Sequence, residues 1–185
     1  MEADLEFLQE KWRVWFNLLD INRDGVLTSS DWNTGAETLI KENNLKPEQA
    51  EIARENFENL GIKLLGDGHL KKKGKAEKHE LVDNLTAFYK ESSNKAYQYI
   101  HDIALHLFML TDVDCNSVVS RKEFTAICKS LGIQSDSAAA FYETLKHADC
   151  ERVPVEAAVN WWVDVFFGTD RDQWERFKNI TSENC

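Results

Sequence analysis

The chain has 185 residues and a formal net charge of −10, because 32 Asp and Glu residues outnumber 22 Lys and Arg residues. This acidity argues against nucleic acid as the main partner and suits cation binding or solubility. No apolar run reaches the roughly 18 residues of a transmembrane helix, and the acidic N-terminus lacks the form of a signal peptide. With 8 Gly and 2 Pro residues, the chain is expected to form long helices with few breaks.

The cysteines show neither the spacing of a metal site nor that of a redox motif. They are Cys115, Cys128, Cys150 and Cys185. Free thiols in a reducing compartment account for them, and we therefore expect a cytoplasmic protein.

Residues 4–19 carry apolar side chains at helical spacing and predict a helix. The twelve residues from Asp20 to Asp31 then place oxygen-bearing side chains at the first, third and fifth positions, glycine at the sixth and a carboxylate at the twelfth. This is the pattern of an EF-hand calcium loop, in which a short segment wraps around a hard cation. The alternative is a solvated Asp/Asn turn. The predicted ligands are Asp20, Asn22, Asp24, the carbonyl of Val26, Thr28 and Asp31.

Helices are expected over 31–43 and from Pro47 to Leu64, and the same frame then recurs over 69–80. Its first, third and fifth positions are His69, Lys71 and Lys73. A lysine ammonium has no lone pair to offer a metal ion, so this loop should not bind calcium. The basic cluster from Lys71 to Lys75 fits a solvated turn, with contact to an anion or partner as the alternative. A helix over 77–91 and a hinge at 92–94 complete this half.

A helix over 95–111 leads into the third loop, residues 112–123, which repeats the ligand pattern. Its predicted ligands are Asp112, Asp114, Asn116, the carbonyl of Val118, Ser120 and Glu123. Ser117 stands where the first loop has glycine, and its resistance to positive φ should weaken this site. Ser120 and Glu123 also form a capping box for a helix that runs to about residue 131, where Gly132 fits the C-terminal cap.

The fourth frame, residues 146–157, follows a helix over 136–145 and has no carboxylate at its first, third, fifth or twelfth position. It should be empty of metal. Its expected role is structural, because Val153 can pair with Val119 as Ala76 can pair with Leu27 in a short strand contact between loops. A helix over 155–167 and a final helix to about residue 178 end the chain.

The repeats therefore predict an all-α fold of four EF-hand frames in two packed pairs, at 1–92 and at 93–185 with the final helix. This arrangement resembles the invertebrate sarcoplasmic calcium-binding proteins and calexcitin, and more distantly the coelenterazine-binding photoproteins. The features that carry the resemblance are Asp31 at position twelve, the degenerate loops, the tryptophan-rich helices and the segment after Val165-Phe166-Phe167. The resemblance implies a compact globule in which two EF-hand pairs pack face to face.

The resulting hypothesis is a monomeric calcium buffer or modest sensor with two Ca²⁺ sites, a protein target being left open. Asp31 is shorter than the usual Glu, so Mg²⁺ should compete at the first site. Two methionines in the chain disfavour an adaptable, methionine-rich groove. The sequence has no nucleophile motif, phosphate-binding loop or zinc spacing, so an enzyme is not expected. The alternative is a carrier of a small apolar ligand in an aromatic cavity lined by Trp12, Trp15, Trp32, Trp161, Trp162, Trp174, Tyr99, His101 and His106, which otherwise form an ordinary core and surface.

Overall fold

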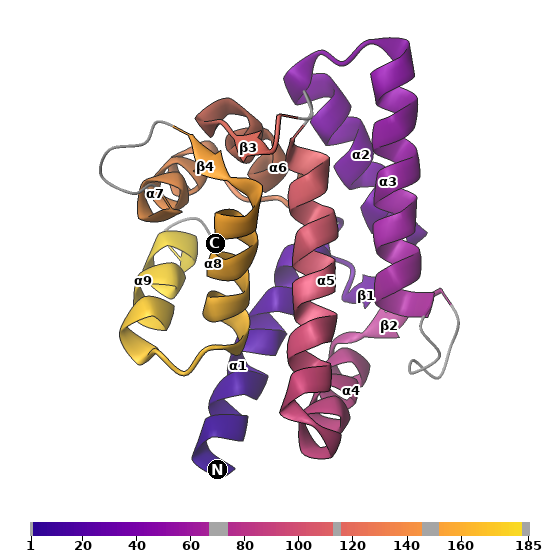
Figure 1. Ribbon diagram of the computed structural model, residues 1–185. Coiled ribbons are helices and arrows are strands. Elements are labelled where there is room, and N and C mark those ends of the chain that lie inside the picture. The colour runs from indigo at the N-terminus through magenta and orange to yellow at the C-terminus, as the bar shows by residue number, and fades with distance from the viewer. Residues whose placement is uncertain (1, 67–73, 113–115, 146–151, 183–185) are drawn as a thin grey trace.

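The computed structural model describes residues 2–66, 74–112, 116–145 and 152–182. In chain order these residues form α1 (Glu2–Leu19), β1 (Val26–Leu27), α2 (Ser29–Asn43), α3 (Pro47–Gly66), β2 (Ala76–Glu77), α4 (Lys78–Glu91), α5 (Ser93–Thr111), β3 (Val118–Val119), α6 (Arg121–Ser130), α7 (Ser135–Leu145), β4 (Val153–Pro154), α8 (Val155–Phe167) and α9 (Arg171–Ser182). The described part of the chain is thus a succession of helix–strand–helix units followed by one terminal helix (Figure 1). The all-α prediction with short β contacts is confirmed.

The short strands join the units in pairs. β1 pairs antiparallel with β2, with Leu27 opposite Ala76, and β3 pairs antiparallel with β4, with Val119 opposite Val153. Both expected strand contacts are therefore confirmed, and each joins a loop with the calcium pattern to a loop without it. All four of these apolar side chains are buried, so the strand contact also closes the core beneath the loops.

Several helices are longer than their periodicity predicts. α2 begins at Ser29 rather than at residue 31, because Thr28 is its N-cap and the Thr28 hydroxyl accepts a hydrogen bond from the Ser30 amide. α9 continues to Ser182, beyond the expected end near residue 178. The expected three-residue hinge at 92–94 is shorter than predicted, since Ser92 alone separates α4 from α5. Gly132 has φ +75 just after α6, as a helix-ending glycine should.

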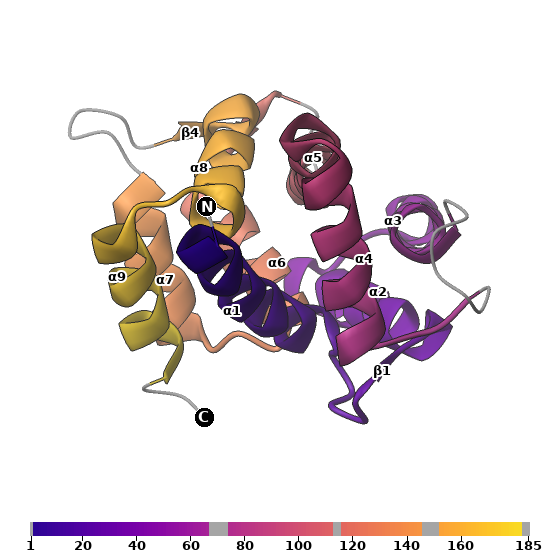
Figure 2. The same cartoon turned by 90° about the horizontal axis from the view of Figure 1, so that it is seen from below.

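Helix α1 runs through the molecule and contacts elements from both ends of the chain. It lies between α4 on one side and α8 on the other (Figure 2). The Trp12 indole donates a buried hydrogen bond of 3.1 Å to the Phe166 carbonyl of α8. Trp12, Trp15 and Phe166 are fully buried, and the core is one continuous cluster of side chains rather than two separate ones. Burial of this aromatic area stabilises the fold.

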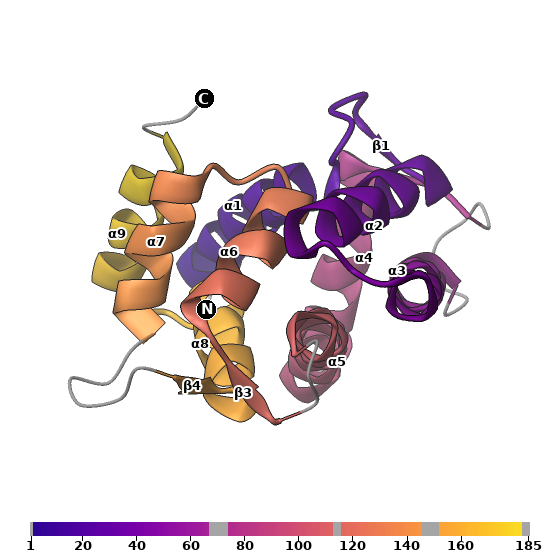
Figure 3. The same ribbon diagram turned by 90° about the horizontal axis from the view of Figure 1, so that it is seen from above.

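The helices that follow the two calcium-pattern loops pack on each other. α2 and α6 lie side by side when the molecule is seen from above (Figure 3), and Lys129 of α6 forms an ion pair of 2.6 Å with Glu42 of α2. Each of these helices starts at its own loop and ends beside the other half of the chain. A helix–helix contact therefore connects the two loops.

Candidate metal centres

The first loop is held in a tight curl by its own acidic and amide side chains. The Asp20 carboxylate accepts hydrogen bonds from the backbone amides of Asp24 (3.2 Å) and Gly25 (2.9 Å). The Asn22 side-chain oxygen accepts from the Asp24 amide, and Asp24 accepts from the Val26 amide, both at 2.9 Å. Asp and Asn side chains that bond the backbone two or more residues ahead stabilise such turns. The predicted ligands at positions one, three and five thus lie together around one turn of backbone.

Two residues of this loop have the left-handed backbone conformation, Arg23 with φ +60 and Gly25 with φ +85. A Cβ placed on Gly25 would meet no atom within 4 Å, so glycine is required there by backbone conformation and not by space. Gly74 has the same φ of +85 at the sixth position of the second frame. The loop geometry at the sixth position therefore persists in a frame whose sequence lacks ligands.

Asp31 closes the first loop from inside the protein. Its carboxylate accepts hydrogen bonds from the backbone amides of Asn22 (3.1 Å) and Thr28 (2.8 Å), and the second of these completes the capping box of α2. Asp31 is 0 % exposed and Asp20 is 7 % exposed. No cationic side chain in the described part of the molecule pairs with either carboxylate. Two buried, unpaired carboxylates are unfavourable unless a cation joins them, and this donor set of hard oxygens fits Ca²⁺ or Mg²⁺.

The third loop repeats this arrangement with its own residues. The Asp112 carboxylate accepts hydrogen bonds from the amides of Asn116 (2.9 Å) and Ser117 (2.7 Å), and the Asn116 side chain accepts from the Val118 amide at 2.9 Å. Glu123 accepts from the amide and hydroxyl of Ser120 and caps α6, as expected. Ser117 adopts φ +63, so the serine takes the conformation that the glycine takes in the first loop. Asp114 lies outside the described residues.

The other two frames are described only in part. Their first, third and fifth positions, His69, Lys71, Lys73, Lys146, Ala148 and Cys150, lie outside the described residues. At the end of the second frame, Glu80 bonds the Glu77 amide at 3.0 Å and caps α4, as Glu123 does for α6. At the fourth frame, Val153 is buried in β4. Both frames thus contribute the strand that pairs with the neighbouring loop.

Among the described residues, no three His, Cys, Asp or Glu side chains gather into a metal-ligand cluster. The first loop instead combines its carboxylates with the amide oxygen of Asn22, the hydroxyl of Thr28 and the carbonyl of Val26. Such a mixed set of oxygens is what an EF-hand loop offers to calcium. It is distinct from a cluster of acidic side chains alone.

Five of the six tryptophans are buried in the core, and Trp161 is partly buried against it. Trp12, Trp15 and Trp174 have no exposed surface, and Trp32 and Trp162 are buried as well. The ring centroids of Trp162 and Phe166 lie 4.9 Å apart, in the range of favourable aromatic contacts. A cavity of about 790 Å³ has none of these tryptophans in its lining. That cavity lies beside the first loop, and sequence reasoning missed it because its walls come from distant segments.

Helix–loop–helix units paired through short strands, with loops curled around acidic side chains, define an EF-hand protein. No protein-family model matches the chain. In sequence the chain is 26% identical over 133 residues to the sarcoplasmic calcium-binding protein of Perinereis vancaurica tetradentata, covering 71% of this chain and 73% of that protein. This similarity and the structural ones below confirm the EF-hand assignment and the resemblance to the sarcoplasmic calcium-binding proteins.

Solved structures with a similar fold include two calcium-loaded proteins. The coelenterazine-binding protein of Renilla muelleri, in its calcium-loaded apo form, has a TM-score of 0.78 with 20% identity, and the match covers 94% of each chain. Calcium-loaded apo-aequorin from Aequorea victoria has a TM-score of 0.57 with 20% identity, covering 88% of this chain and 91% of that one. None of the described helices is both long and apolar enough to span a membrane.

Proposed function

We propose that this protein is a cytosolic calcium-binding protein, a buffer or modest sensor that binds two Ca²⁺ ions. The observation that carries the proposal is that the first loop holds two buried carboxylates, Asp20 and Asp31, neither of which has a cationic partner among the described residues. The sequence similarity to a sarcoplasmic calcium-binding protein supports the same reading. The proposed ligands are Asp20, Asn22, Asp24, Val26, Thr28 and Asp31 at the first site and Asp112, Asp114, Asn116, Val118, Ser120 and Glu123 at the second.

The two sites should differ in ion preference. Asp31 is one methylene shorter than Glu123, so it offers one oxygen more readily than two. A single oxygen favours six ligands around the ion, which suits Mg²⁺, whereas a bidentate Glu123 suits Ca²⁺. We therefore expect Mg²⁺ to compete at the first site and to leave the second largely unaffected.

We propose further that each site belongs to one EF-hand pair, at residues 1–92 and 93–185, and that the protein is a monomer. Within each pair the partner loop lacks ligands and binds no metal. Cooperativity between two bound ions of one pair is therefore not expected.

The test is calorimetric titration of metal-stripped protein with calcium, with and without millimolar magnesium. Two sites are expected, of which one weakens in magnesium. Asp20→Ala should remove one site and Asp112→Ala the other, while Asp83→Ala, an exposed carboxylate on α4, should leave both. Absence of calcium binding in the wild-type protein would refute the proposal. If Asp20→Ala or Asp112→Ala abolished calcium binding at both sites, the two loops would not bind calcium independently, and the assignment of one site to each loop would be refuted.

A second candidate is a carrier of a small apolar ligand in the aromatic interior. The similarity in fold to the coelenterazine-binding protein of Renilla muelleri supports it. The close ring contacts of Phe166 with Trp162 and Trp174 argue against a ligand-sized cavity among these three side chains. Solvent extraction of purified protein followed by mass spectrometry tests the idea, since a stoichiometric apolar compound would favour the carrier and its absence the buffer.

A further inference from the structure

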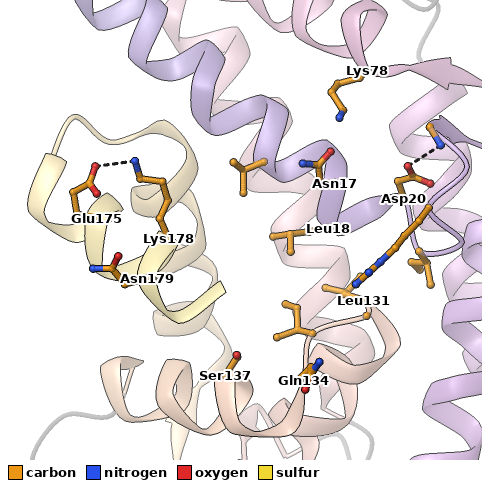
Figure 4. Close-up of a pocket in the computed structure, with 16 residues that line it drawn as sticks. Asn17, Leu18, Asp20, Lys78, Leu131, Gln134, Ser137, Glu175, Lys178 and Asn179 are labelled. Carbon is orange, nitrogen blue, oxygen red and sulfur yellow. Dashed lines mark hydrogen bonds and ion pairs between the residues drawn. The ribbon is translucent and has the colours of Figure 1, made fainter. Parts of the chain in front are cut away.

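A cavity of about 790 Å³ lies beside the first loop, between α1, α9 and the connection from α6 to α7 (Figure 4). Its volume falls within the usual range for small-molecule sites, roughly 300–1,000 Å³. Figure 4 shows Asn17 and Leu18 of α1 facing Glu175, Lys178 and Asn179 of α9 across this space. Neither the proposed metal sites nor the packing of the aromatic core explains the presence of this cavity.

One wall of the cavity is apolar and is built from two segments. α1 and the start of the first loop supply three half-buried aliphatic side chains, and the α6–α7 connection supplies two buried ones. These residues are Val14, Leu18, Ile21, Leu131 and Ile133. A wall of this kind accommodates a hydrocarbon or aromatic body and gains free energy by removing it from water.

The charged side chains around the cavity differ in whether they have an ion-pair partner. On the α9 side, Lys178 is neutralised by Glu175 at 2.8 Å and Glu10 at 3.2 Å. On the side of the first loop, Arg23 and Lys78 also line the cavity or its edge, and within the described residues neither has a carboxylate at ion-pair distance. The cavity therefore combines an apolar wall with two cationic side chains that have no carboxylate partner among the described residues, in a chain whose net charge is −10.

We propose that this cavity binds a small amphipathic anion, an apolar body that carries one acidic group. The body lies on the aliphatic wall, and the acidic group lies on the side of the first loop, where Arg23 is its partner and Lys78 adds positive charge at the edge of the cavity. The guanidinium supplies charge-assisted hydrogen bonds that a neutral compound cannot use. This site differs in position from the tryptophan-rich interior and in chemistry from an apolar carrier site.

The site should also sense the metal, an expectation that rests on the proposed function. Asp20, a proposed calcium ligand, lines the same cavity, and its negative charge repels an anion bound near Arg23. A divalent cation in the loop cancels that repulsion. Calcium should therefore tighten anion binding several-fold, and by linkage the anion should tighten calcium binding at the first loop by the same factor.

Two dyes that share their rings but differ in charge provide the test. Anilinonaphthalene sulfonate carries the anionic group, and phenylnaphthylamine lacks it. We expect the wild-type protein to bind the sulfonate more tightly than the neutral dye, by fluorescence titration in saturating calcium. The double variant Arg23→Asn, Lys78→Gln should lose about tenfold in sulfonate affinity and little in neutral-dye affinity. Asparagine is chosen at position 23 because it tolerates the positive φ found there.

Two further variants locate the dye. Asn17→Trp places a large ring in the cavity from an exposed position on α1 and should block both dyes. Lys41→Gln removes an exposed cation outside the cavity and should change neither affinity. Unchanged binding in Asn17→Trp, or equal loss in Lys41→Gln and in the double variant, would overturn the proposal. A separate calcium titration without dye tells this result apart from failure of the metal sites.

Discussion

The Tyr142 hydroxyl of α7 donates a buried hydrogen bond of 3.0 Å to the Val119 carbonyl in β3. Tyr142 belongs to the unit whose loop lacks metal ligands, whereas Val119 belongs to the loop with the calcium pattern. Burial, with the nearby Glu123 and Glu143 carboxylates adding to it, raises the pKa of Tyr142, so the hydroxyl stays a donor. The unit whose loop lacks the calcium pattern thus fixes the backbone of the loop that has this pattern.

Tyr142→Phe should therefore weaken the third loop without touching a ligand. Loss of this buried hydrogen bond should cost about 1 kcal/mol in the free energy of unfolding. Calcium affinity should fall at the second site alone, as read by calorimetry. Tyr99→Phe, which removes a similar bond from Tyr99 to the Leu64 carbonyl, is the matched control and should leave that affinity unchanged. An equal effect of both variants on the second site would contradict a specific role of the Tyr142 hydrogen bond in calcium binding by the third loop.

Ser117 and Gly25 occupy the same position in their loops and both have positive φ. Ser117→Gly should raise calcium affinity at the second site and add about 1 kcal/mol of stability, because glycine enters this conformation without steric cost. Gly25→Ser should have the opposite effect at the first site. The pair is checked by calcium titration and by denaturant unfolding of each variant. A gain from both substitutions would show that φ at this position does not govern affinity.

Asp31→Glu should change the ion preference of the first site. A longer carboxylate can reach the ion with both oxygens, which favours the larger coordination number of Ca²⁺ over the six ligands of Mg²⁺. We expect competition by millimolar magnesium to decline in this variant, measured as the ratio of calcium affinities with and without magnesium. Glu123→Asp should increase that competition at the second site. Equal ratios in the wild type and in Asp31→Glu would show that the length of the carboxylate side chain at position 31 does not set the ion preference.

Lys11 gives the fold a pH dependence near α9. Its side chain is buried, its ammonium donates a 2.7 Å hydrogen bond to the Gly168 carbonyl, and burial lowers the pKa of Lys11 to about 8. Between pH 8 and the ordinary lysine pKa of 10.5, the unfolded chain holds a proton that the folded chain has released. Stability contributed by this group therefore rises with pH across that window.

The comparison with Lys11→Met isolates this effect. The free energy of unfolding of the wild type, relative to Lys11→Met, should rise by on the order of 2 kcal/mol from pH 8 to 10.5. Other lysines and tyrosines titrate equally in both proteins and cancel in the difference. Denaturant unfolding at several pH values measures it. A flat difference would mean that Lys11 keeps its ordinary pKa in the folded protein.

Metal should also stabilise the whole chain. Ligand carboxylates repel one another without a cation, and an ion that binds only the folded state raises its stability by mass action. We expect the melting temperature of the metal-stripped protein to rise in calcium and to rise less in Asp20→Ala. The control Asp83→Ala should respond as the wild type does. No shift in the wild type under saturating calcium would contradict both the stabilisation and the sites.

The sequence alone predicted the helix–loop–helix repeats and both strand pairings, which the structure confirms, and it led to the proposal that two of the loops bind calcium. These features are local, since twelve consecutive residues carry the ligand spacing and helical periodicity spans a few turns. Helix ends were less well predicted, as at Thr28, because a capping hydrogen bond sets the boundary. Only the tertiary structure showed that the tryptophans fill the core and that a cavity with Arg23 and Lys78 at its edge lies beside the first loop. The walls of that cavity come from α1, α9 and the α6–α7 connection. Contacts between segments so far apart in the sequence leave no periodic pattern in it.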